Sequence, residues 1–217
     1  MKRREFIKTG IGLLAGVSVF FGSLISTARW VYAKAEKIIL PKGTRRQSLI
    51  YRNPASLDAR NLDITNLKDF GTMGLSDHTV DLDAWRFEVT GRVKRPLTLT
   101  YSDILNLPSF EKKVLLICPG VFVNYGIWKG VAMKDLLEKA GLDNNVNQVT
   151  FSGPEGPDEK AERFPIGDVL SNRVFLAYRV NGQPLPKKHG FPLRVVAEGY
   201  YGSDWVKYVD KMILDRR

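Results

Sequence analysis

The chain contains one cysteine, Cys118, in a position where it could be presented to a metal. Four aliphatic residues, Val114 to Ile117, come directly before it, and Pro119 and Gly120 follow. This pattern predicts a strand buried on both faces that ends in a sharp turn, with the thiol at the strand's exit. A thiolate there would suit a soft metal centre, whereas the alternative is a small residue of the core. A single cysteine also excludes an intrachain disulfide.

A second group of candidates lies near the C-terminus and suits an anionic ligand. His189 and Arg194 are five residues apart across a Gly and a Pro, so a stiff turn can direct both side chains at one ligand. Arginine supplies a planar fork of donors for a phosphate, and histidine can donate to a ring system. Lys207 adds a positive charge five residues after Gly202. The alternatives are a packing histidine and a solvated strand lysine.

The elements that would carry these residues are mostly strands. Apolar patterns predict strands at 85–90, 97–99, 114–117, 149–151, 174–178, 193–197 and 207–214. Residues 133–140 repeat apolar side chains at helical spacing, and Gly141 is placed to end that helix. Shorter helices are predicted around Ile104 and at 165–170, and a loop at 153–162. The predicted fold class is α+β, β-rich, with a mixed sheet.

Several segments, in this order and spacing, resemble the molybdopterin-binding domain of the sulfite-oxidase superfamily. They are Trp85–Gly91, Cys118, Ala177–Pro186, His189–Arg194 and Tyr201–Lys207. The resemblance covers roughly residues 82–214 and is strongest to the compact bacterial members, which include periplasmic methionine-sulfoxide reductases. It implies a sulfite-oxidase-type molybdopterin-binding fold.

The resemblance also implies a molybdenum-molybdopterin cofactor, one per chain. Cys118 would be the protein ligand of molybdenum and the catalytic residue. Asn66 and Met73 are expected to line the cofactor from the N-terminal side. The residues expected to bind the pterin are His189, Arg194 and Lys207 through side chains, Trp205 and Val206 through backbone groups and, with a poorer match, Gly153.

The activity that the resemblance implies is transfer of an oxygen atom to or from a small substrate. Sulfite oxidases of the superfamily place arginines near the metal ligand, whereas residues 119–125 contain no cation. Phe122, Asn124 and Tyr125 instead predict a pocket that holds a neutral oxo-compound by apolar contact and hydrogen bonds. Reduction of an S- or N-oxide is therefore favoured over oxidation of sulfite. Arginines elsewhere in the chain could still supply a cation: Arg45, Arg46 and Arg86.

The first 33 residues predict an export signal. Arg3, Arg4 and Phe6 come before an uncharged, largely apolar stretch at 9–27, which resembles a twin-arginine signal peptide. Residues 31–33 fit a cleavage site, although the apolar stretch could stay as a membrane anchor, and an ordinary N-terminal membrane helix is the alternative. We therefore expect a periplasmic or exported protein.

Residues 34–61 are polar and basic without a regular period, which predicts a linker or an arm on the surface of a domain at 62–217. The whole chain has 33 Lys and Arg against 23 Asp and Glu. Because this excess is scattered, a small anionic ligand is expected and nucleic acid is not. No stretch suits a haem domain, so electrons are expected from a separate partner such as a membrane haem protein or a cytochrome.

Two other classes of protein stay open on the sequence alone. One is a non-catalytic exported module that keeps the fold and binds another ligand in its pocket. The other is an unrelated β-rich adhesion or carbohydrate-binding protein, which would leave the paired arginines at the N-terminus unexplained. The molybdenum content of the purified protein separates the enzyme from both.

Overall fold

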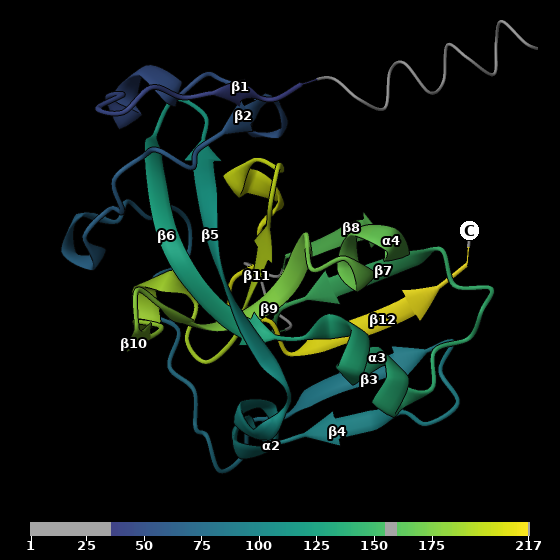
Figure 1. Cartoon of the computed structure of the whole chain (residues 1–217). Helices are drawn as coiled ribbons and strands as arrows, with labels where there is room; N and C mark the ends of the chain where they lie inside the picture. Colours follow the sequence, from purple (N-terminus) through teal and green to yellow (C-terminus); the bar gives the residue numbers. More distant parts are fainter. Residues whose placement is uncertain (1–35, 155–159, 217) are drawn as a thin grey trace, which may run out of the picture. The chain divides into compact units, whose positions relative to one another are not determined.

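The computed structural model describes residues 36–154 and 160–216, so the predicted export signal at 1–33 lies outside the described residues. From Ile38 onward the chain forms one unit, built on two five-stranded sheets with short helices between the strands (Figure 1). Within the described ranges, none of the helices has the length and apolar character that crossing a membrane requires.

The first sheet carries Cys118. Its strands follow the order β10-β9-β6-β5, β11 also pairs with β9, and all of these pairings are antiparallel. β5 and β6 form a long hairpin in which Cys118 pairs with Phe122, so the cysteine lies at the hairpin turn. The bounds are β5 Ser109–Cys118, β6 Phe122–Val131, β9 Val174–Val180, β10 Gln183–Pro184 and β11 Arg194–Ala197.

The second sheet is mixed, as predicted. Its order is β4-β3-β12-β7-β8, and β12 runs parallel to β3 but antiparallel to β7. This pairing brings the last strand of the chain back beside β3, the first long strand of the domain. The bounds are β3 Phe87–Gly91, β4 Leu97–Leu99, β7 Gln148–Ser152, β8 Ala161–Pro165 and β12 Lys211–Asp215.

The helices are short and begin and end at recognisable residues. α2 (Tyr101–Asn106) starts with a capping box between Thr100 and Asp103. α3 (Met133–Ala140) buries its apolar stripe and ends at Gly141, whose φ of 71° is the left-handed conformation that glycine adopts readily. The others are α4 Ile166–Leu170 and the 3-10 turns η1 Arg46–Leu49, η2 Pro54–Ser56, η3 Leu67–Asp69, η4 Lys187–His189 and η5 Gly202–Asp204.

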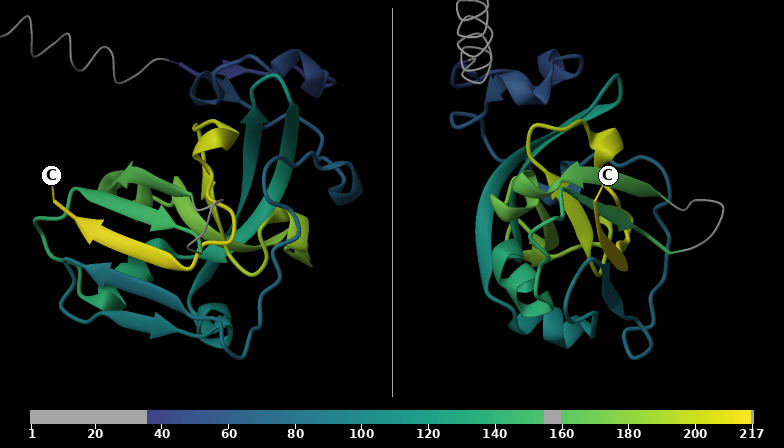
Figure 2. Two further views of the ribbon diagram at one scale, coloured as in Figure 1. Left: turned by 180° about the vertical axis from the view of Figure 1, so that it is seen from behind. Right: turned by 90° about the vertical axis from the view of Figure 1, so that its right-hand side faces the viewer.

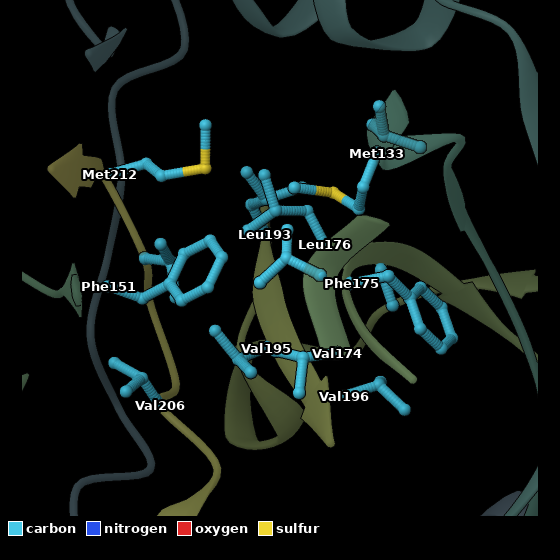
Figure 3. Packing of buried hydrophobic residues seen from close by; sticks show 14 of the residues in the cluster. Met133, Phe151, Val174, Phe175, Leu176, Leu193, Val195, Val196, Val206 and Met212 are labelled. Carbon is cyan, nitrogen blue, oxygen red and sulfur yellow. The ribbon is translucent and has the colours of Figure 1, made fainter. Parts of the chain in front are cut away.

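The main core lies between the two sheets. Figure 3 shows Phe151 and Met212 of the second sheet facing Leu176 and Val195 of the first, with Met133 of α3 beside them. β9 is buried on both faces from residue 174 to residue 178, which confirms the prediction from its continuous apolar run. This core holds β11, and with it Arg194, in a fixed position.

A smaller second core joins residues 38–62 to the other face of the β5–β6 hairpin. Because side chains alternate along a strand, Leu115 and Ile117 face this core while Val114 and Leu116 face the main one. The stretch predicted as a linker or arm therefore contains β1 (Ile38–Ile39) and β2 (Leu57–Asp58), a short parallel pair that lies over the hairpin turn (Figures 1 and 2). The cluster consists of Leu40, Leu49, Ile50, Leu57, Leu62, Leu115, Ile117, Val123 and Tyr125.

Besides the short strands β1, β2 and β10 and the longer β5, the structure differs from the sequence prediction at three elements near the site. β6 is absent from the prediction, although its aromatic and β-branched residues after a Pro-Gly turn are typical of a hairpin strand. β8 begins at Ala161, inside the predicted loop. β12 begins at Lys211, so Lys207 lies in irregular backbone before the strand and not within it.

Candidate active site

A cavity of about 370 Å³ gathers residues that are far apart in the sequence. Its walls come from residues 71–75, the turn end of the β5–β6 hairpin, the two flanks of the 153–160 loop, and residues 189–208. Met73 lies in the wall as expected. Six of the seven residues predicted to bind cofactor or metal also line it: Cys118, Gly153, His189, Arg194, Trp205 and Lys207.

Val206 and Asn66 are the two residues predicted to contact the cofactor that do not line this cavity. The Val206 side chain is buried in the main core, and its carbonyl accepts a hydrogen bond from the Val195 amide at 2.9 Å. Asn66 lies just before η3, where its carbonyl accepts from the Asp69 amide. Both backbone carbonyls therefore accept hydrogen bonds from within the protein.

Arg194 opens β11 and is the most deeply buried cation of the site. Its guanidinium lies between two aromatic rings, 5.2 Å from the Trp128 centroid and 5.4 Å from the Trp205 centroid. It donates to the His189 carbonyl at 2.9 Å, and no carboxylate of the described chain pairs with it. Burial lowers the pKa of Arg194 to about 10. A stacked guanidinium with free donors is suited to a planar or phosphorylated anion.

His189 ends η4 and is held neutral by its surroundings. Its side chain is 2% exposed, and its ring meets the edge of Phe70 at a centroid distance of 5.7 Å. Burial, followed by the charges of Arg194, Lys188 and Lys207, lowers the pKa of His189 to about 4. At neutral pH the ring therefore has one donor and one acceptor nitrogen, as hydrogen bonding to a pterin requires.

Lys207 connects the 71–75 segment to the rest of the cavity wall. Its ammonium donates to the Thr72 hydroxyl, to the Leu75 carbonyl and, at 3.5 Å, to the Lys188 carbonyl. All three acceptors are neutral, so its charge is not compensated by them. Burial and the nearby Arg194 lower the pKa of Lys207 to about 8. A bound anion would favour the charged form of this lysine.

Cys118 is buried at the turn end of β5. Burial raises the pKa of its thiol, and the charge of Lys160 opposes that effect. Gly202 allows the close approach of η5 to the cysteine, since a Cβ there would lie 2.8 Å from Leu116 Cδ1 and 3.5 Å from Cys118 Cα. The structure thus holds the thiol on a rigid hairpin end, where a metal can displace its proton.

Gly153 and Tyr208 shape the backbone on the Lys207 side of the cavity. A Cβ at Gly153 would lie 3.2 Å from the Lys207 carbonyl and 3.3 Å from that of Tyr208, so only glycine allows this approach without a shift. Tyr208 has a φ of 57°, which is costly for an aromatic residue. Its hydroxyl donates to the Leu75 carbonyl at 3.1 Å, and its ring lies 4.9 Å from that of His78.

The lining residues that sequence reasoning missed include four with polar or shaping roles, namely Leu75, His78, Lys160 and Tyr208. Tyr208 directly follows Lys207 and could have been found from that position alone. Lys160 had no such signal, because only the pairing of β8 with β7 returns the far side of the 153–160 loop to Cys118.

Two residues expected to contact substrate, Asn124 and Tyr125, instead contact other parts of the fold. The Asn124 amide makes two 3.0 Å hydrogen bonds with the backbone N–H and C=O of Gly71, so it holds the 71–75 segment and is occupied. Tyr125 points to the opposite face of β6, into the second core, because neighbouring side chains of a strand alternate. Of the three predicted pocket residues, Phe122 alone lines the cavity.

The donor set fits a large anionic cofactor. Among the described lining residues there is no aspartate or glutamate, while Arg194 and Lys207 contribute positive charge and Lys160 is paired with Glu162, which does not line the cavity. His189 Nε2, Arg194 Nε and Trp205 Nε1 are buried without a hydrogen-bond partner. Buried polar groups without partners cost free energy, so a ligand that accepts hydrogen bonds would be stabilising here. One buried thiol facing the same cavity adds a soft metal ligand.

A thiol and a set of unpaired buried donors in one cavity suit a cofactor that combines a soft metal with an anionic, hydrogen-bonding group. Residues 74–217 match the oxidoreductase molybdopterin binding domain family, and the chain belongs to that family. The predicted fold class and the predicted relationship to the sulfite-oxidase superfamily are confirmed, and residues 74–217 form a molybdopterin-binding oxidoreductase domain.

Three relatives show how far the similarity extends. The oxidoreductase YuiH of Bacillus subtilis (strain 168) is 34% identical over 131 residues, covering 58% of this chain and 65% of that protein. An NADH nitrate reductase of Oryza sativa subsp. japonica is 30% identical over 164 residues, but the match covers 18% of its length. The crystal structure of the sulfane dehydrogenase SoxCD from Paracoccus pantotrophus superposes with a TM-score of 0.61 at 19% identity, covering 86% of this chain and 52% of that one. This last similarity shows the fold alone.

The residues present would hold the cofactor at its two ends. Cys118 would provide the thiolate ligand, while Arg194, His189 and Lys207 would hold the pterin and its phosphate. When bound, molybdenum-molybdopterin supplies two-electron redox chemistry coupled to oxygen-atom transfer. The protein's contribution would be to orient that group and to exclude water around it, in a cavity that Phe122 and Lys160 also line.

Proposed function

We propose that this chain is an exported oxidoreductase that transfers an oxygen atom to or from a small substrate, and that it reduces S- or N-oxides better than it oxidises sulfite. Reduction of an oxide consumes two electrons and two protons and releases water. The electrons would come from a separate carrier, a membrane haem protein or a cytochrome. Export by the twin-arginine route is supported by the paired arginines and the apolar stretch that follows them.

The observation that carries the substrate preference is the charge beside Cys118. Lys160 is the cation that influences the pKa of this thiol, and its ammonium lies 3.4 Å from a Glu162 carboxylate oxygen. The pair is close to neutral as a unit. Desolvating a doubly charged anion beside a compensated cation costs several kcal/mol more than placing a neutral oxide there. Lys160 can still donate one hydrogen bond to the oxide oxygen.

None of the three arginines that could supply another cation lines the cavity itself. Arg45 and Arg46 line a separate groove that shares Gly71 and Phe122 with the cavity. Arg86 donates to the carbonyls of Asp83 and Trp85. Phe122, from the turn end of β6, forms an apolar wall where a dianion would need a donor.

The test compares two reactions on molybdenum-loaded protein. Sulfite oxidation is followed with an artificial acceptor, and reduction of an S-oxide and an N-oxide with a reduced viologen dye. We expect kcat/KM for the better oxide to exceed that for sulfite by orders of magnitude. Efficient sulfite oxidation without measurable oxide reduction would contradict the proposal.

A Glu162→Gln variant tests the electrostatic reason directly. Removing the carboxylate leaves the Lys160 charge uncompensated, so sulfite oxidation should improve relative to oxide reduction. Glu111→Gln on β5 is the matched control and should leave the ratio unchanged, since Glu111 is not part of the cavity. An unchanged ratio in both variants would show that charge beside Cys118 does not select the substrate.

A further inference from the structure

The turn that follows Cys118 reaches the surface of the molecule. Val121 is 48% exposed, and its amide donates to the Cys118 carbonyl at 3.0 Å. Tyr51 is 79% exposed and lies beside this turn: the Gly120 amide donates to the Ile50 carbonyl, and a Cβ on Gly120 would be 3.6 Å from the Tyr51 ring. Two exposed, largely apolar side chains therefore lie within one turn of Cys118, the residue that would hold the metal.

The segment that carries Tyr51 is rich in positive charge. Residues 41–56 contain four basic residues, Lys42, Arg45, Arg46 and Arg52, and no acidic one. Arg45 and Arg46 line a groove of about 480 Å³ that adjoins the active-site cavity, and Asp69 is the acid that shares this groove. Arg45 and Arg52 are exposed and Arg46 is half-exposed, and among the described residues no carboxylate forms a salt bridge with any of the three. η1, which carries Arg46, packs against β6 (Figures 1 and 2).

We propose that this surface, formed by Arg45, Arg46, Tyr51, Arg52 and Val121 and called here the hairpin-turn face, docks an acidic electron-transfer protein. The inference rests on the proposed function, because reduction of one oxide takes two electrons. A one-electron carrier must therefore deliver an electron twice for each oxide reduced. Charge complementarity identifies the carrier as a protein with an acidic surface around its redox centre. A small apolar patch with a charged rim is the composition of a transient interface.

The position of the face favours a redox protein over an anionic lipid surface. Cys118 pairs with Phe122 across the hairpin and is hydrogen-bonded to Val121, so a carrier bound here would lie one turn of backbone from the metal ligand. Attachment to a membrane would need no such proximity. The charged rim would speed association and make it dependent on salt, as a carrier that must bind and leave twice per turnover requires.

The experiment uses the molybdenum-loaded full chain and, as probe, a soluble c-type cytochrome of net negative charge. Its Kd is measured by calorimetry at low and at physiological ionic strength. We expect R45E/R46E to weaken binding by about tenfold or more at low salt, and added salt to weaken binding of the unmodified chain. Y51A should weaken it as well, since an exposed aromatic residue is a typical anchor of an interface.

The matched control is K134E/K139E on α3, at the other end of β6 from the hairpin turn. It changes net charge equally and should alter Kd by less than about twofold. Equal weakening by both pairs, or by neither, would overturn the proposal. Sedimentation with phosphatidylglycerol vesicles in place of cytochrome binding would overturn it in favour of a lipid surface. Viologen-driven oxide reduction needs no docking, so it should persist in R45E/R46E. If the unmodified chain and all variants lack this activity, the result would instead refute the proposed function.

Discussion

At the scale of single residues, the site is organised around buried positive charge. Arg194 is buried between Trp128 and Trp205, and its Nε has no hydrogen-bond partner. Lys207 donates its hydrogen bonds to neutral acceptors. Cations taken out of water without an acidic partner cost free energy. An anionic cofactor would offset that cost, so the cofactor should stabilise this protein as well as equip it for catalysis.

The first prediction concerns the metal ligand. Cys118→Ser should keep the fold, because the side chains are similar in size, but should abolish turnover, since a hydroxyl is a harder and weaker donor than a thiolate. Circular dichroism checks the fold, metal analysis the molybdenum content and the viologen assay the activity. Oxide reduction at the rate of the unmodified protein would refute the ligand assignment.

The second prediction concerns pH and the cofactor-free protein. The pKa of Lys207 is about 8 in the fold and 10.5 as a free side chain, so between these values the unfolded chain binds more protons. The free energy of unfolding should therefore rise as pH increases from about 8 to about 10, where the unfavourable buried charge is lost. Urea denaturation across this range measures the rise.

Lys207→Met supplies the control for this prediction, because it removes the titrating group and should flatten the rise. A Lys207→Met variant with the same slope above pH 8 as the unmodified protein would show that another group titrates there.

On the acid side, the pKa of His189 is lowered to about 4, so the cofactor-free fold should lose stability as pH falls from about 6.5 towards 4.

At the scale of elements, the β5–β6 hairpin organises the molecule. One face contributes to the main core and the other to the second core, while its turn carries Cys118. Gly71 packs so closely against Phe122 that a Cβ would lie 2.3 Å from its ring. The hairpin therefore positions the metal ligand and the 71–75 wall together.

The third prediction tests the connection between β6 and this wall. Asn124→Ala removes both hydrogen bonds to the Gly71 backbone, which should lower the free energy of unfolding by about 1–3 kcal/mol. Hydrogen exchange at the Gly71 amide should accelerate at the same time. Asn66→Ala, an exposed site whose side chain makes no cap, should stay within about 0.5 kcal/mol. Similar losses in both variants would contradict the assigned role of Asn124.

At the scale of the whole molecule, two cores share one hairpin and the active site lies along its turn. Residues 38–62, although polar and basic in composition, cover one face of this hairpin and expose their charges around the turn. Stability and the surface around the active site therefore depend on the same segment. Loss of this segment would uncover the apolar side chains of Leu115, Ile117 and Val123.

The fourth prediction concerns export and rests on the sequence alone. Replacing Arg3 and Arg4 together by Lys keeps the charge but removes the paired guanidinium groups. A receptor-recognised twin-arginine signal should then fail, and the protein should accumulate inside the cell with its cofactor bound. Fractionation measures the distribution; unchanged periplasmic accumulation would indicate a general basic signal instead.

The sequence by itself determined the features that depend on near neighbours. The exit of a buried strand at Cys118, the stripe of α3 and its end at Gly141 follow from residue types a few positions apart, and the structure confirms all three. The order and spacing of short sequence segments were also enough to predict the family and the cofactor, and the comparisons confirm both predictions.

Only the tertiary structure decided which distant groups meet. It brought Lys160 to Cys118 through the pairing of β7 with β8, and it joined Asn124 to Gly71 across 53 positions. It also buried one face of the hairpin under residues 38–62. Such contacts depend on strand order and register, which involve many weak pairings distributed over the chain. No local pattern encodes them, and so only the tertiary structure shows which groups line the cavity beside Cys118.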